Sequence, residues 1–324
     1  MIRYMGCKKG IAKQLLNAIP SAVHFYDLFG GGGSMTESAY ESKCVLKDWS
    51  GGVVKWDYIH YNDINQGVYL LNKEIWEGVF DFEKAYNTWI SKDIFLETKD
   101  EPTSWGAFVK FIWSFNQQGK NYIYCEKLEL EKLLLHFFIK SNEIMPGLSR
   151  YEKQSRFTEL FSVFCLQNGL ADYNESKCGQ KRKDNLKMRN YCYTSSTLIK
   201  SEHLTKIEQI KNSPKLDLNR LSMTCKDYRD VEILPDSVVY CDIPYNTPVG
   251  VRKNSYDVKF DFEIFYDWAA TRNFPVFISE YECVDSRFKT VLEVPKIKGG
   301  NAGGNKSGVE KLFWNGKNLR EEKT

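Results

Sequence analysis

An apolar run at residues 22–29 leads directly into four consecutive glycines, Gly30–Gly33, and a helix is predicted to follow at residues 34–43. A strand, a glycine loop and a helix in this order form a nucleotide-type site, because glycine lets the backbone approach a ligand closely. The dinucleotide pattern G-x-G-x-x-G does not fit, since Met35 and Thr36 stand where its third glycine should be. The segment therefore favours an α/β fold that binds another adenosine-bearing ligand. A flexible surface linker is the alternative.

A second strand is predicted at residues 56–62, and it ends at Asp63. An acidic side chain at the tip of the second strand lies where such folds bind a ribose diol. Asp63 follows Gly33 at a longer distance than the ~20 residues typical of dinucleotide sites. An insertion around residues 49–52 accounts for the extra length. The alternative is that Asp63 only forms a turn with Asn62.

Strands are predicted again only from residue 218 onward, after a long region of helical spacing and polar segments. An insert between the second and third strands of a sheet makes a natural second domain. The sequence thus predicts a Rossmann-like α/β sheet formed by residues 1–65 and 216–324, with a mostly helical domain at residues 66–215. The predicted helices are 8–19, 66–77, 104–115 and 127–140, and the later strands are 221–225, 237–241, 275–280 and 289–294.

Asp242 follows the apolar run at residues 237–241 and precedes Ile243, Pro244 and Tyr245. This order places a carboxylate, a rigid turn and an aromatic ring at the carboxyl end of a strand. A carboxylate and a backbone carbonyl that accept both N–H bonds of a flat exocyclic amine would stabilise the positive charge that develops on it. The tyrosine offers a face on which a base can stack. A simple turn is the alternative.

Composition limits the kind of chemistry that we expect. The four histidines and nine cysteines show no metal-ligand spacing, which predicts a reduced, metal-free, cytoplasmic protein. No run approaches the ~18 apolar residues of a membrane-spanning helix, and the N-terminus lacks the apolar region of a signal peptide. We therefore expect no membrane partner.

Basic residues cluster within residues 66–215, although the net charge of +3 is too small to indicate a nucleic-acid partner by itself. Three tyrosines, at positions 173, 191 and 193, flank the cluster. Basic side chains interleaved with aromatic rings are typical of a nucleic-acid surface, and a solvated charged loop is the alternative. The basic residues are Lys177, Lys181, Arg182, Lys183, Lys187 and Arg189.

Several short segments stand in a distinctive order along the chain. They are RYMGCK at 3–8, YDLFGGGGS at 26–34, NDIN at 62–65, CKDY at 225–228, DIPY at 242–245, FISEY at 277–281 and EKLF at 310–313. This order resembles the Dam-like, alpha group of DNA adenine-N6 methyltransferases, of the phage and prophage type, over nearly the whole chain. The resemblance implies S-adenosyl-L-methionine (AdoMet) as the methyl donor, with no metal.

The resemblance also implies roles for individual residues. The catalytic residues would be Asp242, Ile243, Pro244 and Tyr245. The cofactor would be bound by Tyr4, Lys8, Asp27, Phe29, Gly30, Gly31, Gly32, Gly33, Ser34, Asp63, Ile64, Asp227 and Tyr228. DNA would be contacted by Asn116, Gln117, Lys120, Asn121 and Tyr124. The composition of the basic cluster adds Lys181, Arg182, Lys183, Lys187 and Arg189 as expected DNA contacts.

Two departures from the family pattern stand out. Ile243 replaces the first proline of the family's Asp-Pro-Pro-Tyr motif, although its carbonyl can still accept a bond from the amine. Residues 113–121 resemble a DNA-reading stretch of the family, but Gln117 stands at the position of an arginine there. GATC is therefore not implied as the target sequence.

The expected function is the site-specific transfer of a methyl group from AdoMet to the N6 amine of adenine in DNA, with the target base flipped out of the duplex. The expected partners are double-stranded DNA and a possible companion restriction endonuclease, and the expected state is a monomer. Three alternatives stay open: an amino-cytosine DNA methyltransferase, a protein or small-molecule amine methyltransferase, and a non-catalytic DNA-binding protein on the same fold. We expect a cytoplasmic location, in a bacterial or phage-infected cell.

Overall fold

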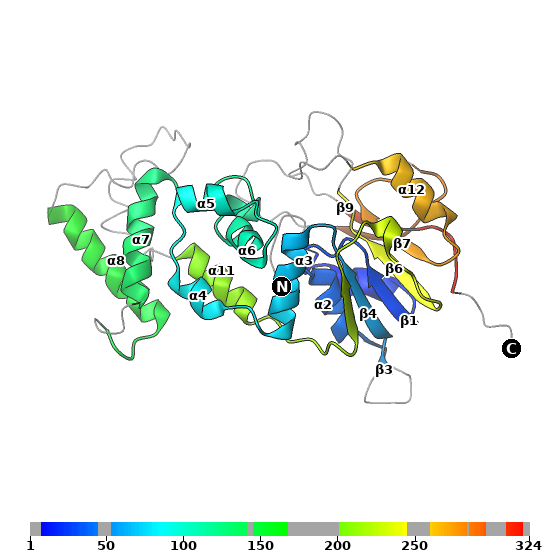
Figure 1. The fold of residues 1–324 in the computed structure, drawn as a ribbon, viewed down its shortest axis with the longest axis horizontal. Coiled ribbons are helices and arrows are strands. Elements are labelled where there is room, and N and C mark those ends of the chain that lie inside the picture. Colours follow the sequence, from blue (N-terminus) through cyan, green and yellow to red (C-terminus); the bar gives the residue numbers. More distant parts are fainter. Residues whose placement is uncertain are drawn as a thin grey trace.

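The protein is described here from a computed structural model that covers residues 8–44, 53–140, 145–167, 201–244, 260–283, 285–295 and 309–319. A seven-stranded mixed sheet forms one side of the molecule, and a group of helices forms the other (Figure 1). The predicted fold, an α/β sheet with helices inserted between its second and later strands, is confirmed.

The sheet has the strand order β5-β4-β1-β6-β7-β9-β8. The first five strands in this order are parallel, and β9 runs antiparallel between β7 and β8. The strands are β1 (Ala22–Asp27), β4 (Trp56–Asn62), β5 (Leu221–Thr224), β6 (Ser237–Cys241), β7 (Val276–Glu280), β8 (Lys289–Pro295) and β9 (Val309–Trp314). A separate short hairpin joins β2 (Lys43–Cys44) to β3 (Val53–Val54).

The order of the chain reverses at β1, which pairs with β4 on one side and with β6 on the other. In parallel sheets, ligands bind in the crevice that opens beyond the carboxyl ends of the strands at such a switch point. A ligand site is therefore expected at the carboxyl ends of β1, β4 and β6.

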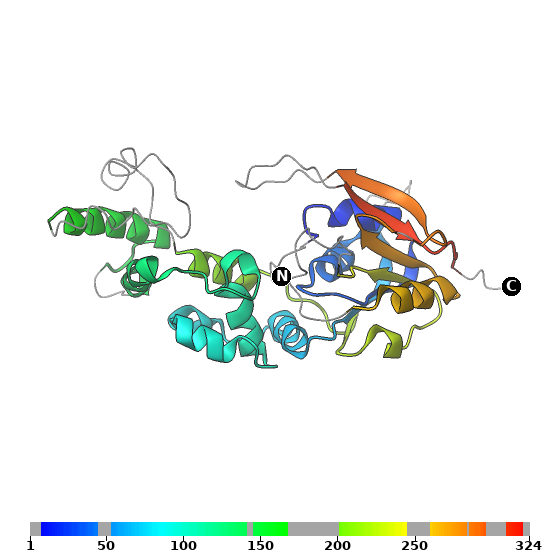
Figure 2. The same cartoon turned by 90° about the horizontal axis from the view of Figure 1, so that it is seen from above.

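Two layers of helices cover the sheet. Phe25 and Val238 belong to the core beneath α1 (Ala12–Ala18), α2 (Ser34–Glu41) and α3 (Gln66–Glu77). Their neighbours along the strands, Tyr26 and Val239, belong to the core beneath α12 (Phe262–Thr271). Figure 2 shows α1 and α12 on opposite sides of the sheet. Because every residue of β6 is buried, this strand needs apolar residues at both alternating positions.

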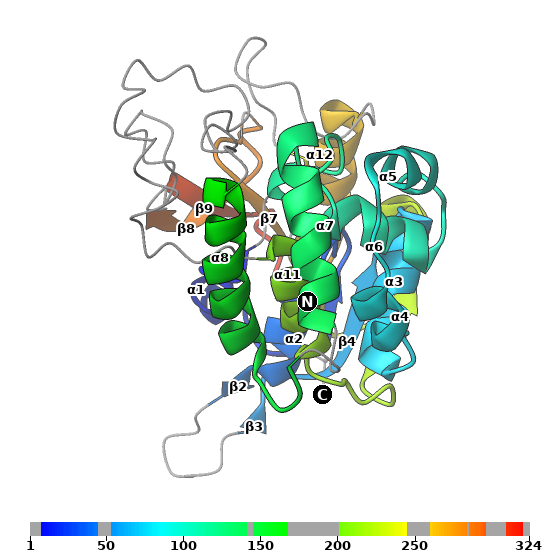
Figure 3. The same cartoon turned by 90° about the vertical axis from the view of Figure 1, so that its left-hand side faces the viewer.

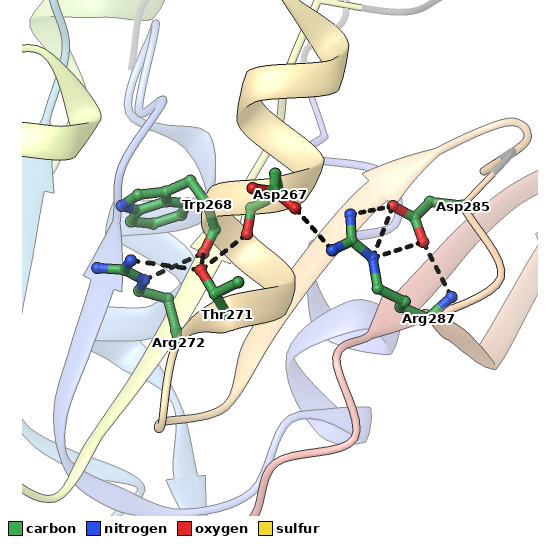
Figure 4. A network of polar contacts seen from close by, with 6 residues as sticks. All are labelled: Asp267, Trp268, Thr271, Arg272, Asp285 and Arg287. Carbon is green, nitrogen blue, oxygen red and sulfur yellow. Dashed lines mark hydrogen bonds and ion pairs between the residues drawn. The ribbon is translucent and has the colours of Figure 1, made fainter.

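Two arginines contact the carboxyl-terminal half of α12 (Figure 4). Arg287 contacts Asp267 of α12 at 2.8 Å and Asp285 of its own loop at 2.6 Å. Arg272 donates from Nε to the Trp268 carbonyl at 3.0 Å, which satisfies one of the carbonyls left open at the end of a helix.

The inserted helices lie together beside α3 (Figures 1 and 3). They are α4 (Phe82–Asn87), α5 (Lys92–Thr98), α6 (Ser104–Ile112), α7 (Glu126–Lys140), α8 (Arg150–Gln167) and α11 (Glu202–Lys211). Four helices in this region begin with a side chain that accepts a bond from a backbone amide of the first turn, as N-caps do. These caps are Asn65, Asp81, Ser91 and Thr103. The hydrophobic spacing of the sequence does not predict α4, α5, α8, α11 or α12.

α3 is the helix through which the inserted helices meet the sheet. At Gly67 a β-carbon would lie 3.0 Å from the carbonyl oxygen of Thr103, so glycine permits the close approach of α3 to α6. At its other end, Trp76 donates from Nε1 to Glu37 of α2 at 2.9 Å.

The division into domains at residues 65 and 216 stays a prediction. None of the helices in the described part of the chain is long and apolar enough to cross a membrane.

Candidate active site at the ends of the central strands

An acidic side chain lies at the carboxyl end of each of the three central strands. Asp27 is the last residue of β1, Asp63 follows β4 and Asp242 follows β6. The three carboxyl groups lie close enough for their charges to interact, because Asp242 and Asp63 both contribute to raising the pKa of Asp27. The sequence predicted roles at one site for all three, and the topology brings them to one edge of the sheet.

The glycine loop that follows β1 is held from both sides by neighbouring elements. The Gly31 carbonyl accepts from the Tyr61 hydroxyl at 2.8 Å and from the Asn72 side-chain amide at 2.6 Å. A β-carbon on Gly30 would lie 2.3 Å from the Tyr61 ring, and one on Gly33 would lie 2.3 Å from the Trp76 ring. Gly33 also has a φ of 79°, which favours glycine. These two glycines are thus required for packing the loop against β4 and α3.

Asp63 connects this loop to the end of β4. Its Oδ2 accepts from the Gly31 amide at 2.8 Å, and its Oδ1 accepts from the Asn65 amide at 2.8 Å. Burial raises the pKa of Asp63 to about 6, against the lowering effect of these two backbone bonds. Each carboxylate oxygen has a further lone pair, so the group can still accept bonds from a ligand. Ile64, the next residue, is exposed.

Asp27 is fully buried beneath the same loop, and only one of its carboxyl oxygens has a partner among the described residues. Oδ2 accepts from the Thr36 hydroxyl at 2.7 Å, whereas Oδ1 has no hydrogen-bond partner among the described residues. Burial raises the pKa of Asp27 to about 7, although the Thr36 bond lowers it. A buried acceptor without a donor is costly, and at this position it indicates a place for a ligand's N–H or O–H group.

Asp242 is held by a buried lysine from the other end of the chain. Lys8 Nζ lies 2.8 Å from Asp242 Oδ1 and 3.0 Å from Glu310 Oε1. The Lys8 and Glu310 side chains are buried, whereas that of Asp242 is 23 % exposed. Burial alone lowers the pKa of Lys8, but the two carboxylates outweigh it and raise that pKa above its ordinary value. Asp242 is therefore the member of the group that a substrate can reach.

Aromatic side chains gather near the ends of β1 and β5. Phe29 and Tyr228 have ring centroids 5.4 Å apart, and Tyr228 also packs against Phe265 and Trp268 of α12. Asp227 is held by Arg229 at 2.8 Å, in the short 3-10 helix η3 (Tyr228–Asp230). Tyr228 is half-buried, so part of its ring remains available to a flat ligand beside the switch point.

The remaining predicted residues of this site are distributed as follows. Ile243 is buried and Pro244 is half-buried, directly after Asp242. Ser34 begins α2, and its hydroxyl accepts from the Lys8 amide at 3.3 Å. Gly32 lies in the same loop as Gly31. Tyr4 and Tyr245 lie outside the described residues, as do Lys181, Arg182, Lys183, Lys187 and Arg189 of the basic cluster.

The segment after α6 forms a short loop with an unusual backbone. The predicted helix 104–115 ends at Ile112, because residues 114 and 122 form an antiparallel bridge instead. Asn116 and Gln117 have φ values of 49° and 57° within η1 (Phe115–Gln117). Two successive non-glycine residues in the left-handed region cost on the order of 1 kcal/mol each. Such strain persists only where the surrounding structure enforces it.

Several contacts enforce this loop conformation. The Phe115 amide donates to the Asn121 carbonyl at 2.8 Å, and the Gly119 amide donates to Ser114 Oγ at 2.9 Å. Lys206 of α11 donates from Nζ to the Ser114 carbonyl at 3.2 Å. Burial lowers the pKa of this lysine to about 8. Because these hydrogen bonds fix its backbone, the loop is a preformed feature of the helical region.

The predicted DNA-contacting residues of this loop differ in exposure. Asn116, Lys120 and Asn121 are exposed, and Gln117 is half-buried. Phe115, which the sequence analysis did not select, is 53 % exposed at the same tip. Tyr124 is buried instead, and its hydroxyl lies 2.8 Å from His203 Nδ1. Only the tip of the loop therefore presents side chains to a large partner.

Sequence reasoning did not assign roles to Glu310, Ser279, Thr36 or Asn72. Glu310 and Ser279 lie on β9 and β7, and Ser279 donates from Oγ to Glu310 Oε1 at 2.6 Å. The sequence signal was the resemblance of the segments at 277–281 and 310–313 to the family, which indicated closing strands but gave no role to either side chain. No group of three or more histidine, cysteine, aspartate or glutamate side chains within the described ranges could hold a metal ion.

Two comparisons with known proteins bear on this site. The family model of the D12 class N6 adenine-specific DNA methyltransferases matches residues 4–263. The match spans the glycine loop, the three strand-end acids and the inserted helices. A comparison with curated proteins gave no match.

Proposed function

The chain belongs to the D12 class of N6 adenine-specific DNA methyltransferases, and we propose that its active site is the group of carboxylates at the ends of β1, β4 and β6. It is an enzyme that methylates the N6 amine of adenine in DNA, and its family implies AdoMet as the methyl donor. Membership favours an enzyme over a non-catalytic binding protein and adenine over an amino-cytosine target. The roles of individual residues are proposals.

The residues around the glycine loop fit the methyl donor. When bound, AdoMet supplies an electrophilic methyl group on its sulfonium, so the transfer itself requires no metal. Asp63 would accept bonds from the ribose hydroxyls, and the unpartnered Oδ1 of Asp27 would accept from the amino group of the methionine end. Phe29 and Tyr228 would contact the adenine ring, with Asp227 beside them. The orphaned oxygen of Asp27 is the observation that most directly supports this fit.

Asp242 would hold the target amine. Its carboxylate and the Ile243 carbonyl would accept the two N–H bonds, which would localise the nitrogen lone pair and stabilise the developing positive charge. The partial exposure of Asp242, beside buried Lys8 and Glu310, supports its contact with a substrate. Tyr245 would stack on the flipped base. Isoleucine at position 243 leaves this arrangement possible, because the backbone carbonyl and not the side chain accepts the bond.

The loop at residues 114–122 would meet the DNA. Its exposed polar side chains can reach base edges, and Phe115 is an exposed apolar group of the kind that proteins insert between base pairs. Insertion beside the target would lower the cost of flipping the base. The enforced backbone at Asn116 and Gln117 supports this role, because a preformed loop loses less entropy on binding. The basic cluster would contact phosphates.

Further proposals concern the partners. Base flipping implies a double-stranded substrate, and we propose that a monomer acts on it, in the cytoplasm of a bacterium or a phage-infected cell. A companion restriction endonuclease would use the same recognition sequence.

The position of Asp242 at the switch-point edge carries the proposal, and its conversion to asparagine tests it. Labelled methyl transfer from AdoMet to duplex DNA, followed by nucleoside analysis, should give N6-methyladenine with the wild-type enzyme. Asp242→Asn keeps the shape and should lose on the order of 10²-fold or more in kcat, with AdoMet affinity nearly unchanged. Full turnover by this variant would remove Asp242 from the catalytic role.

A further inference from the structure

Glu310 occupies an unusual position behind the proposed catalytic carboxylate. It lies on β9, its side chain is fully buried, and its Oε1 receives both Lys8 Nζ at 3.0 Å and Ser279 Oγ at 2.6 Å. On its other side, Lys8 contacts Asp242 at 2.8 Å. One ammonium group is thus shared between a buried carboxylate and an accessible one.

Burying an ionised carboxylate costs free energy unless hydrogen-bond donors or opposite charges nearby stabilise it. A single carboxylate, that of Asp242, would already give the Lys8 ammonium an ion-pair partner. Glu310 adds a second negative charge beside the Lys8 ammonium, and Ser279 orients its oxygen. Packing alone does not explain this choice, because an apolar residue would fill the same space at lower cost.

The charge of Glu310 has a direct consequence for Asp242. A lysine that pairs with one carboxylate alone withdraws negative charge from it and weakens it as an acceptor for a nitrogen that becomes positive. A second carboxylate at 3.0 Å attracts the same ammonium group and offsets its field at Asp242. Lys8 can then fix the orientation of Asp242 without cancelling its charge.

We infer that Glu310 is a positioning residue for methyl transfer, which acts through Lys8 to keep Asp242 oriented and negatively charged. This inference rests on the proposed role of Asp242 and assigns to the closing strands, β7 and β9, a part in the reaction. Glu310 touches neither the base nor the methyl donor in this scheme. Its effect should therefore appear in the rate of transfer and not in the binding of either substrate.

Two variants test this role in single-turnover methyl transfer with enzyme saturated by AdoMet and duplex DNA. Glu310→Gln keeps the size and removes the charge, so the transfer rate should fall roughly ten- to a hundredfold, less than for a direct contact. Lys8→Met/Glu310→Gln removes the cation together with its counter-charge. This double variant should be about tenfold faster than Glu310→Gln, because Asp242 regains its uncancelled charge.

Matched controls separate charge from folding. Glu293→Gln alters an exposed glutamate of β8 that pairs with Lys311 of β9 at 3.4 Å, and its transfer rate should equal that of the wild type. Ser279→Ala removes the bond to Glu310 and should cost a few-fold in rate. The affinities for AdoMet and DNA should stay within about twofold in Glu310→Gln, Ser279→Ala and Glu293→Gln, whose thermal unfolding is measured in parallel.

Two results would overturn the inference. One is a Glu310→Gln rate within twofold of the wild type. The other is a double variant that is no faster than Glu310→Gln, since that would show a purely structural requirement. If Glu310→Gln does not fold, an unchanged rate in Ser279→Ala is the overturning result. Asp242→Asn remains inactive in each of these cases unless the proposed function itself is wrong, so the two failures are distinguishable.

Discussion

The Gly31 amide donates to Asp63 Oδ2 at 2.8 Å, across 32 positions of the chain. This bond joins the loop after β1 to the end of β4 at the point where the strand order of the sheet reverses. It positions the carboxylate before any ligand is present, and it leaves lone pairs on both oxygens for the hydroxyls of a ribose. The same contact therefore shapes the loop and prepares the proposed cofactor site.

Asp63→Asn should weaken AdoMet binding without abolishing methyl transfer at saturation. A hydrogen bond to a charged group contributes ~1.5–3 kcal/mol, so the dissociation constant should rise roughly ten- to a hundredfold. Asparagine retains an oxygen for the Gly31 amide, which limits the disturbance of the loop. Isothermal titration calorimetry measures this constant directly, and an unchanged value would return Asp63 to a structural turn.

The affinity of the wild type for AdoMet should also depend on pH. Asp63 has its pKa raised to about 6 by burial, and its ionised form is the better acceptor. Affinity should be constant well above pH 7 and should fall in two steps, first as Asp27 is protonated near pH 7 and again as Asp63 is protonated near pH 6. Asp63→Asn has no proton to gain in the second step and should show only the first. A second step that persists in the variant would show that another group governs it.

Phe115→Ala should impair the opening of the duplex rather than the chemistry. We expect roughly a tenfold loss of kcat/KM on a fully paired site. Unstacking a base costs a few kcal/mol, and the contacts of the inserted Phe115 ring would offset part of this free energy. A duplex with a mismatch at the target adenine, already partly open, should recover most of the loss. Leu96→Ala, at an exposed position of α5, is the control and should behave as the wild type.

The basic cluster should set DNA affinity without selecting the sequence. Lys181, Arg182 and Lys183 lie outside the described residues, so this prediction depends on composition alone. Removing one contact to a DNA phosphate lowers the slope of log affinity against log salt by about 0.9. Replacing all three residues by glutamine should reduce that slope by up to about three while the methylated site stays the same. If the target sequence changed while the salt slope stayed the same, the basic cluster would be the part that reads the sequence, and the loop at residues 114–122 would not be.

The paired histidines of the helical region should make its stability depend on pH. His136 and His203 are buried with ring nitrogens 3.0 Å apart, and burial lowers the pKa of His136 to about 4 and that of His203 well below its ordinary value. Between about pH 4 and 6.5 the unfolded chain therefore binds protons that the folded chain does not, so stability falls with falling pH.

From pH 7.5 to 5.5 this linkage should cost about 1 kcal/mol per histidine in the free energy of unfolding, measured with urea. His136→Gln is expected to be less stable overall, but its stability should change less over the same interval. Equal pH dependence in the two proteins would show that carboxylates elsewhere control it.

Much of the site was predictable because its parts are local in the chain. Gly30–Gly33 after an apolar strand, Asp63 at the end of the next strand and Asp242 after a third are each recognised from a few adjacent residues. In a parallel sheet the carboxyl ends share one edge, which is why the acids at the ends of β1, β4 and β6 meet in the structure. The role of two glycines was not predictable, because the Tyr61 and Trp76 rings that require them come from β4 and α3.

The sequence by itself determined the order of strand, glycine loop and helix, the long helical insert and the acids that end the central strands, because hydrophobic periodicity and turn residues act over short distances. Only the tertiary structure decided that β9 enters between β7 and β8, and that Glu310 thereby reaches Lys8. It also decided that Tyr124 is buried while Phe115 is exposed. These outcomes depend on packing between segments far apart in the chain, and local propensity does not encode that packing.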